Sequence, residues 1–148
     1  HLPLLEALNE LDFYKKQPPK SLGLEWVQSE VFSIINNFNL EPSSVLRTLV
    51  EHAASQIANV IVSQNLQTGL FTGGGVLNSF LMQRIAHILD RPIPPTNGKL
   101  IHYKEALVFG FLGVLKLRQE VNCLRSVTGA KEDHSSGEIY WPSLRVNA

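Results

Sequence analysis

The sequence is poor in the features that mark several classes of protein. Its 148 residues include one cysteine, Cys123, so no internal disulfide can form, and this suits a reducing cytoplasm. The 13 basic and 13 acidic side chains cancel, whereas proteins that bind nucleic acid usually carry a basic excess or patch. No apolar run approaches the roughly 20 residues of a membrane span, and no signal-like N-terminus is present. We therefore expect no nucleic acid and no membrane as partners.

The motifs of common catalytic and metal sites are also absent. The five histidines show neither H-E-x-x-H nor a pairing with cysteine at metal-site spacing, so we expect no metal site in this chain. No Gly-Lys-Ser or Gly-Lys-Thr occurs, which excludes a phosphate-binding P-loop, and no G-x-S-x-G elbow presents a nucleophile. These absences leave the sequence without an assembled catalytic set.

What is present indicates a globular chain. Hydrophobic residues make up 44% and charged residues 18%, a composition that can form a core. The chain begins with His1 and not with methionine, so we expect functional parts upstream and interpret residues 1–148 as a single partial domain. Within it we expect a helical segment over 1–66, a strand-turn-helix segment on the nucleotide side over 67–120, and a surface tail over 121–148.

Apolar periodicity predicts helices over about 3–11, 24–37, 42–64, 76–89 and 103–119. The inward face of the second helix is predicted to hold Trp26, Val27, Val31, Ile34, Ile35 and Phe38, and that of the third Val45, Leu46, Leu49, Val50, Ala53, Ile57 and Ile61. The last helix is apolar on nearly every side, so we expect it to be buried, with Gly110 and Gly113 admitting another backbone. One short strand is predicted at 70–72, and the proline-rich segment 91–98 can add at most an edge strand. The fold class is therefore α/β and helix-rich, with few strands.

Three successive glycines join the predicted strand to the helix that follows it. Gly73, Gly74 and Gly75 leave no Cβ between the backbone and a ligand, and Asn78 can form hydrogen bonds from the first helical turn. We interpret these four residues as a nucleotide-contacting turn. The alternative is a glycine-rich connection that only packs tightly. A dinucleotide fingerprint is excluded, because Asn78 occupies the position of its last glycine.

Three separated motifs stand out in the sequence. They are Pro18-Pro19-Lys20-Ser21-Leu22-Gly23-Leu24-Glu25, Thr72-Gly73-Gly74-Gly75-Val76-Leu77-Asn78, and Lys104-Glu105-Ala106-Leu107-Val108-Phe109 followed by Ser126-Val127-Thr128-Gly129-Ala130. Together they resemble the C-terminal part of the anhydro-N-acetylmuramic acid kinase family. Their order and spacing match over nearly the whole chain. One departure is Leu24, where the family usually carries arginine.

The resemblance implies an actin-like ATPase fold of the sugar kinase and chaperone ATPase superfamily, in which two ribonuclease-H-like lobes hold ATP between them. Members open the 1,6-anhydro ring of anhydro-N-acetylmuramic acid with water and phosphorylate its 6-hydroxyl, with ATP and Mg²⁺, during peptidoglycan recycling in the bacterial cytoplasm. They are typically homodimers. The catalytic aspartate and phosphate loops of the family lie upstream of the matched region. The resemblance thus implies no catalytic base here, an isolated chain that is inactive, and a missing N-terminal lobe as partner.

By the same resemblance, Glu105 points into the cleft and accepts hydrogen bonds from the sugar. The alternative is that Glu105 only stabilises the positive end of a helix that begins near Tyr103. A second class of function also stays open, namely a non-catalytic nucleotide-binding module such as a chaperone ATPase lobe. An aspartate-rich phosphate loop upstream of His1 would favour the kinase.

Overall fold

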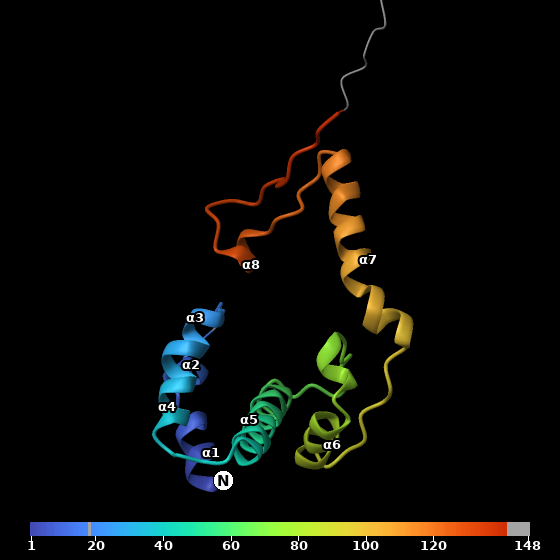
Figure 1. Cartoon of the computed structure of the whole chain (residues 1–148). Helices are drawn as coiled ribbons and strands as arrows, with labels where there is room; N and C mark the ends of the chain where they lie inside the picture. The colour runs from blue at the N-terminus through green and yellow to red at the C-terminus, as the bar shows by residue number, and fades with distance from the viewer. Residues whose placement is uncertain (18, 142–148) are drawn as a thin grey trace, which may run out of the picture. The chain divides into compact units, whose positions relative to one another are not determined.

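The computed structural model describes residues 1–17 and 19–141 (Figure 1). Pro18 of the first family motif and residues 142–148 of the expected tail lie outside the described residues. The chain divides into two compact units, His1–Lys104 and Glu105–Ala148, and each is described by itself. No helix among the described residues is long and apolar enough to cross a membrane.

The fold is helix-rich, as predicted. The first unit contains α1 (Leu2–Asn9), α2 (Asp12–Lys15), α3 (Leu24–Trp26), the π-helical turn η1 (Val27–Val31), α4 (Phe32–Asn36), α5 (Pro42–Ser63), the 3-10 turn η2 (Gly74–Leu77) and α6 (Ser79–Ile88). Helix α7 (Gly98–Leu117) runs from the first unit into the second, which also holds α8 (Arg125–Thr128). Because α3, η1 and α4 follow one another without a break, they form the single helical segment predicted over 24–37.

The core of the first unit lies where α1 meets this segment. Leu4, Leu8 and Val31 are buried. Partly buried residues packed around them are Leu11, Trp26, Val27, Ile34, Ile35, Phe38, Leu40 and Leu49. The predicted inward face of the 24–37 helix is therefore confirmed. It arises because apolar residues three and four positions apart share one side of a helix.

The most deeply buried residues of helix α5 are not those that the sequence predicts, although the predicted inward residues other than Leu46 are partly buried. Its buried residues are Thr48, His52, Ala54 and Ala58, whereas Leu46, predicted to point inward, is 64% exposed. The reason is that α5 packs against α1 and also against α6. Small and hydrogen-bonded side chains therefore fill the contacts on both sides of α5, and part of its apolar stripe stays outside them.

The predicted strand at residues 70–72 is not formed. These residues lie in a loop, and the described part of the chain contains only an isolated bridge between Cys123 and His134. A strand requires a ladder partner along its length. No described segment supplies one to Leu70, Phe71 and Thr72, so the α/β class is confirmed only in its helical part.

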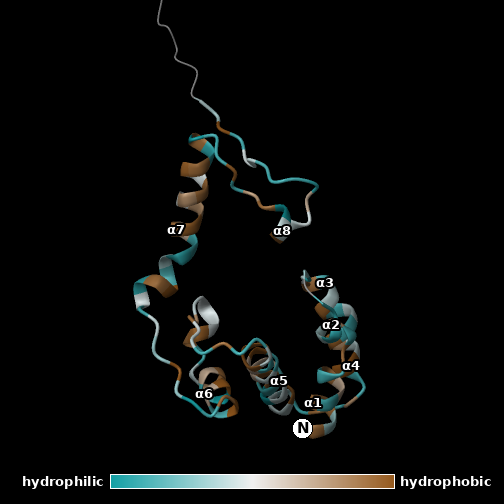
Figure 2. Ribbon diagram, turned by 180° about the vertical axis from the view of Figure 1, so that it is seen from behind, coloured by the Kyte–Doolittle hydropathy of each residue, from teal (hydrophilic) through white to brown (hydrophobic). Residues whose placement is uncertain are grey.

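The prediction for the last helix is wrong in two respects. Helix α7 begins at Gly98, five residues before Tyr103, because the side chain of Asn97 accepts a hydrogen bond from the N–H of Lys99 at 2.8 Å and so caps the helix. None of its residues is buried, although Figure 2 shows it to be hydrophobic along most of its length. Residues 1–17 and 19–141 also supply no close neighbour to Gly110 and Gly113, since a Cβ at either would meet no atom within 4 Å.

Candidate functional site

The glycine turn has one glycine that the backbone requires and two that it does not. Gly73 has φ of +88°, which strongly favours glycine, while Gly74 and Gly75 begin the 3-10 turn η2. An added Cβ at any of the three positions would meet nothing within 4 Å. Tight packing within the described part of the chain therefore does not account for Gly74 and Gly75. Their N–H groups open a helical turn and have no acceptor within that turn.

Asn78 links the glycine turn to α6. Its Oδ1 accepts a hydrogen bond from the N–H of Leu81 at 3.0 Å, which makes Asn78 the N-cap of the helix. Its side-chain NH₂ group has no hydrogen-bond partner among the residues that the structure describes. Asn78 therefore has a structural role that accounts for its oxygen, and its NH₂ group is available as a donor to a ligand.

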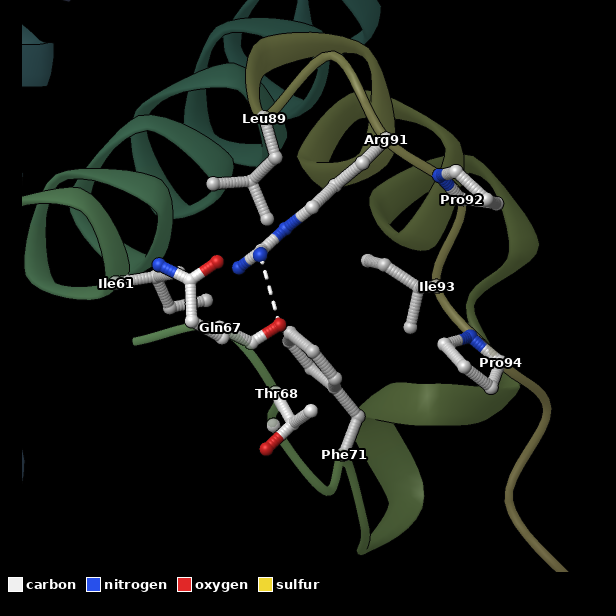
Figure 3. A pocket seen from close by; sticks show the side chains of 10 residues that line it. Ile61, Gln67, Thr68, Phe71, Leu89, Arg91, Pro92, Ile93 and Pro94 are labelled. Atoms are coloured by element: carbon white, nitrogen blue, oxygen red, sulfur yellow. Dashed lines mark hydrogen bonds between the residues drawn. The ribbon is translucent and has the colours of Figure 1, made fainter. Parts of the chain in front are cut away.

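Residues 91–96 form hydrogen bonds with the backbone of the segment that precedes the glycine turn. The Arg91 guanidinium donates to the carbonyls of Leu66 and Gln67, both at 2.8 Å, and the Thr96 hydroxyl donates to the carbonyl of Phe71. Figure 3 shows Arg91 reaching across to Gln67 over a small pocket. The proline-rich segment thus fixes the loop that leads into the turn, a role that its sequence did not indicate.

The pocket beside this loop has a volume of about 170 Å³ and is mostly apolar. It is lined by Ile61, Gln67, Thr68, Gly69, Phe71, Leu89, Arg91, Pro92, Ile93 and Pro94 (Figure 3). Thr72 follows Phe71, which lines the pocket, and its Oγ1 atom is buried without a hydrogen-bond partner among the described residues. A buried polar group left unpaired costs roughly 1–3 kcal/mol. A hydrogen-bond partner for the Thr72 hydroxyl, beside Gly73, would therefore stabilise the protein.

A buried histidine, which the sequence analysis did not single out, joins three helices of the first unit. Nδ1 of His52 lies 2.7 Å from Oδ1 of Asn9, and Nε2 lies 2.8 Å from the Tyr14 hydroxyl. Because an amide oxygen only accepts, Nδ1 carries the proton and Nε2 accepts from Tyr14. Burial lowers the pKa of His52 below its ordinary value. On α5, His52 lies four residues after Thr48, which is also buried, so the two share one face of the helix.

Lys20, in the first family motif, has a structural role. Its Nζ donates to the carbonyls of Phe13 at 3.0 Å and Tyr14 at 3.1 Å, and it lies 5.0 Å from the centre of the Phe13 ring. A cation at this place stabilises the C-terminal end of α2 and also interacts with the aromatic ring. The motif therefore ties its loop to α2.

Glu105 is exposed on α7, in the second unit, while the glycine turn and Asn78 belong to the first. Since α7 begins at Gly98, Glu105 lies about two turns beyond the helix start. The favourable effect of a carboxylate on the helix dipole is confined to the first turn. The interpretation of Glu105 as a stabiliser of the helix N-terminus is therefore wrong.

Metal ligands do not gather in the described part of the chain. No group of three or more histidine, cysteine, aspartate or glutamate side chains there could hold a metal ion. The residues of the glycine turn can offer a ligand backbone N–H groups and an amide, which suit a polar or anionic group and not a cation.

Comparison with known proteins identifies one family. The model of the anhydro-N-acetylmuramic acid kinase family matches residues 1–142. The anhydro-N-acetylmuramic acid kinase of Actinobacillus pleuropneumoniae is 36% identical over 148 residues, which cover 93% of this chain and 39% of that protein. The enzymes of the same name from Sulfurovum sp. and Bordetella avium are 32% and 31% identical, over 93% of this chain and 39% and 38% of theirs. The chain thus spans about two-fifths of these relatives, at their C-terminal part.

Proposed function

The chain belongs to the anhydro-N-acetylmuramic acid kinase family, and we propose that it acts as the C-terminal part of such a kinase. In this proposal the complete polypeptide uses ATP to open the 1,6-anhydro ring of anhydro-N-acetylmuramic acid and to phosphorylate its 6-hydroxyl, in peptidoglycan recycling. The match over residues 1–142 is the observation that carries the proposal.

We assign the nucleotide to the glycine turn. Gly74 and Gly75 are exposed and have open space where side chains would be, so the adenosine side of ATP can approach the backbone closely. The NH₂ group of Asn78 can donate a hydrogen bond to a ligand at the same turn. The Thr72 hydroxyl, which has no hydrogen-bond partner among the described residues, is a second polar group there. Fixing the preceding loop by Arg91 and Thr96 reduces the conformational entropy lost when the ligand binds.

We assign the sugar to Glu105. An exposed carboxylate whose position on the helix gives it no dipole role is free to accept hydrogen bonds from hydroxyl groups of a substrate. Such charge-assisted bonds would orient the anhydro ring for attack by water. The base that activates the water is expected upstream of this chain.

The remaining parts of the proposal concern the complete kinase. Mg²⁺ would accompany ATP, but the described residues of this chain do not fit a magnesium site, because their carboxylates do not cluster. The N-terminal lobe, an actin-like arrangement of two lobes, homodimer formation and a cytoplasmic location complete the proposal.

Activity assays test this proposal directly. The isolated chain, incubated with ATP, Mg²⁺ and anhydro-N-acetylmuramic acid, should form no 6-phosphate, since phosphoryl transfer needs a positioned nucleophile and charge stabilisation that it lacks. The complete polypeptide that contains these residues should form the 6-phosphate. Product formed by the isolated chain at enzyme-like rates would contradict the assignment of the catalytic base to the part of the kinase upstream of this chain. The absence of product from the complete polypeptide would contradict the proposed function.

The alternative function, a non-catalytic module such as a chaperone ATPase lobe, is not favoured. The relatives from A. pleuropneumoniae, Sulfurovum sp. and B. avium are each named as kinases of one sugar. The alternative would be supported if the complete polypeptide bound ATP but did not phosphorylate the sugar.

A further inference from the structure

One side of α7 carries an apolar stripe in the second unit. Each of its residues lies three or four positions from another, so they share one face of the helix: Leu107, Gly110, Phe111, Val114 and Leu117. We call this face the 107–117 stripe. The side chains of Leu107, Phe111, Val114 and Leu117 are 67%, 60%, 50% and 60% exposed. A contiguous apolar face of this kind marks an interaction surface.

The described residues of the second unit leave the stripe exposed, although its loop after α7 and part of the stripe line the same groove. The loop forms its hydrogen bonds at other positions of the helix. Lys116 Nζ donates to the carbonyl of Ser135, and Asn122 Nδ2 donates to the carbonyl of Leu112, each at 3.4 Å. A groove of about 830 Å³ lies on that flank, between α7 and the loop. The stripe is continuous with the edge of this groove at Gly110, Val114 and Leu117.

Gly110 indicates what kind of contact the stripe makes. It lies in the middle of the stripe, and a Cβ there would meet no atom within 4 Å. Glycine within a helix destabilises it relative to alanine, so an element whose backbone approaches closely at this point would explain its presence. Since the stripe carries no charge, the approaching element is apolar.

The family comparison indicates where this element comes from. The match covers 93% of this chain but only 39% of the A. pleuropneumoniae kinase, so in that relative the counterpart of α7 belongs to a polypeptide about two and a half times as long. We propose that the 107–117 stripe is the docking surface for an apolar element of the N-terminal part of the kinase polypeptide, which lies outside this chain. The proposal rests on the proposed function, because it takes this chain as the C-terminal part of that kinase.

The test uses the whole chain together with the separately expressed N-terminal three-fifths of the A. pleuropneumoniae kinase. We expect the two to co-purify and hydrogen exchange in residues 105–117 to slow at least tenfold in the complex. Phe111→Glu should weaken the association more than tenfold. Phe109→Glu is the matched control, since it makes the same substitution on the same helix at a residue that is 69% exposed and is not three or four positions from any residue of the stripe, and it should alter the association less than threefold. Circular dichroism should show unchanged helix content in both variants.

Other outcomes overturn the proposal. No complex, or equal effects of Phe111→Glu and Phe109→Glu, would remove the stripe as the docking surface. Slow exchange of residues 105–117 in the chain alone, independent of concentration, would mean that the chain covers its own stripe. Slow exchange only at high concentration, with dimers in sedimentation, would assign the stripe to a second copy. These readouts do not depend on phosphorylation, so a protected complex without kinase activity would contradict the proposed function and leave the docking surface standing.

Discussion

The hydroxyl of Tyr14 donates a hydrogen bond to Nε2 of His52 over 2.8 Å, so the short helix α2 is tied to the middle of α5. The two rings meet edge to face, with centroids 5.1 Å apart. Since Lys20 in turn donates to the carbonyl of Tyr14, this bond also connects the loop of the first family motif to the core. A buried neutral histidine therefore helps to hold that loop.

His52 should make the stability of the fold depend on pH. Burial lowers its pKa below the ordinary value of 6.5, so below about pH 6.5 the unfolded chain binds more protons than the folded one. The contribution of His52 is complete above this pH and is lost as the pH falls through the lowered pKa. Urea unfolding between pH 7.5 and 5 should show falling stability, with a smaller fall in His52→Gln. The exposed His102, replaced by glutamine, is the control, and an equal loss of slope in that variant would contradict the prediction.

The ion pair between α5 and α6 should couple the stabilities of these helices. Arg84 donates from Nε to Oε2 of Glu51 at 2.7 Å and from Nη2 to Oε1 at 2.8 Å, and this pairing lowers the pKa of Glu51. We expect a favourable coupling in a double-mutant cycle with Glu51→Gln and Arg84→Gln. It should exceed that of the exposed pair Glu10 and Lys15, whose side chains are 75% and 57% exposed. Equal coupling energies in the two pairs would show that the second hydrogen bond between Arg84 and Glu51 does not stabilise the fold.

The glycines of the turn should separate stability from ATP binding. Gly73→Ala should destabilise the complete kinase by roughly 1–2 kcal/mol, because φ of +88° strains a residue with a Cβ. Gly74→Val should leave the melting temperature nearly unchanged, since open space receives the side chain, but should raise KM for ATP several-fold. Gly74→Ala is the smaller control. Normal ATP dependence in folded Gly74→Val would remove the nucleotide from this turn.

Glu105 should matter for the sugar and not for stability. Hydrogen bonds to a charged group contribute roughly 1.5–3 kcal/mol, so Glu105→Gln in the complete kinase should lower sugar turnover about 10- to 100-fold. The melting temperature should not change, because Glu105 lies beyond the first turn of α7. Glu132→Gln, at another exposed carboxylate, is the control. Turnover within a factor of two of the unmodified enzyme would exclude Glu105 from the substrate site.

The sequence by itself was sufficient for the features that depend on neighbours along the chain. The 24–37 helix and its inward face were predicted, and α5 was placed within a residue, because helical hydrogen bonds are local and the apolar period reports one buried side. The family was also recognisable from short strings such as Pro18-Pro19-Lys20-Ser21. The N-cap of α7 was available in the sequence as well, since Asn97 precedes the helix, but it was not recognised.

The tertiary structure decided what depends on distant partners. The segment 70–72 has strand composition but no ladder partner among the described residues, and α7 has the composition of a buried helix, yet the described residues leave its stripe exposed. In the same way, His52 became the centre of a polar network only when Asn9 and Tyr14 were brought beside it. Burial and strand pairing are relations between residues far apart in sequence, so periodicity indicates a need for a partner without identifying one.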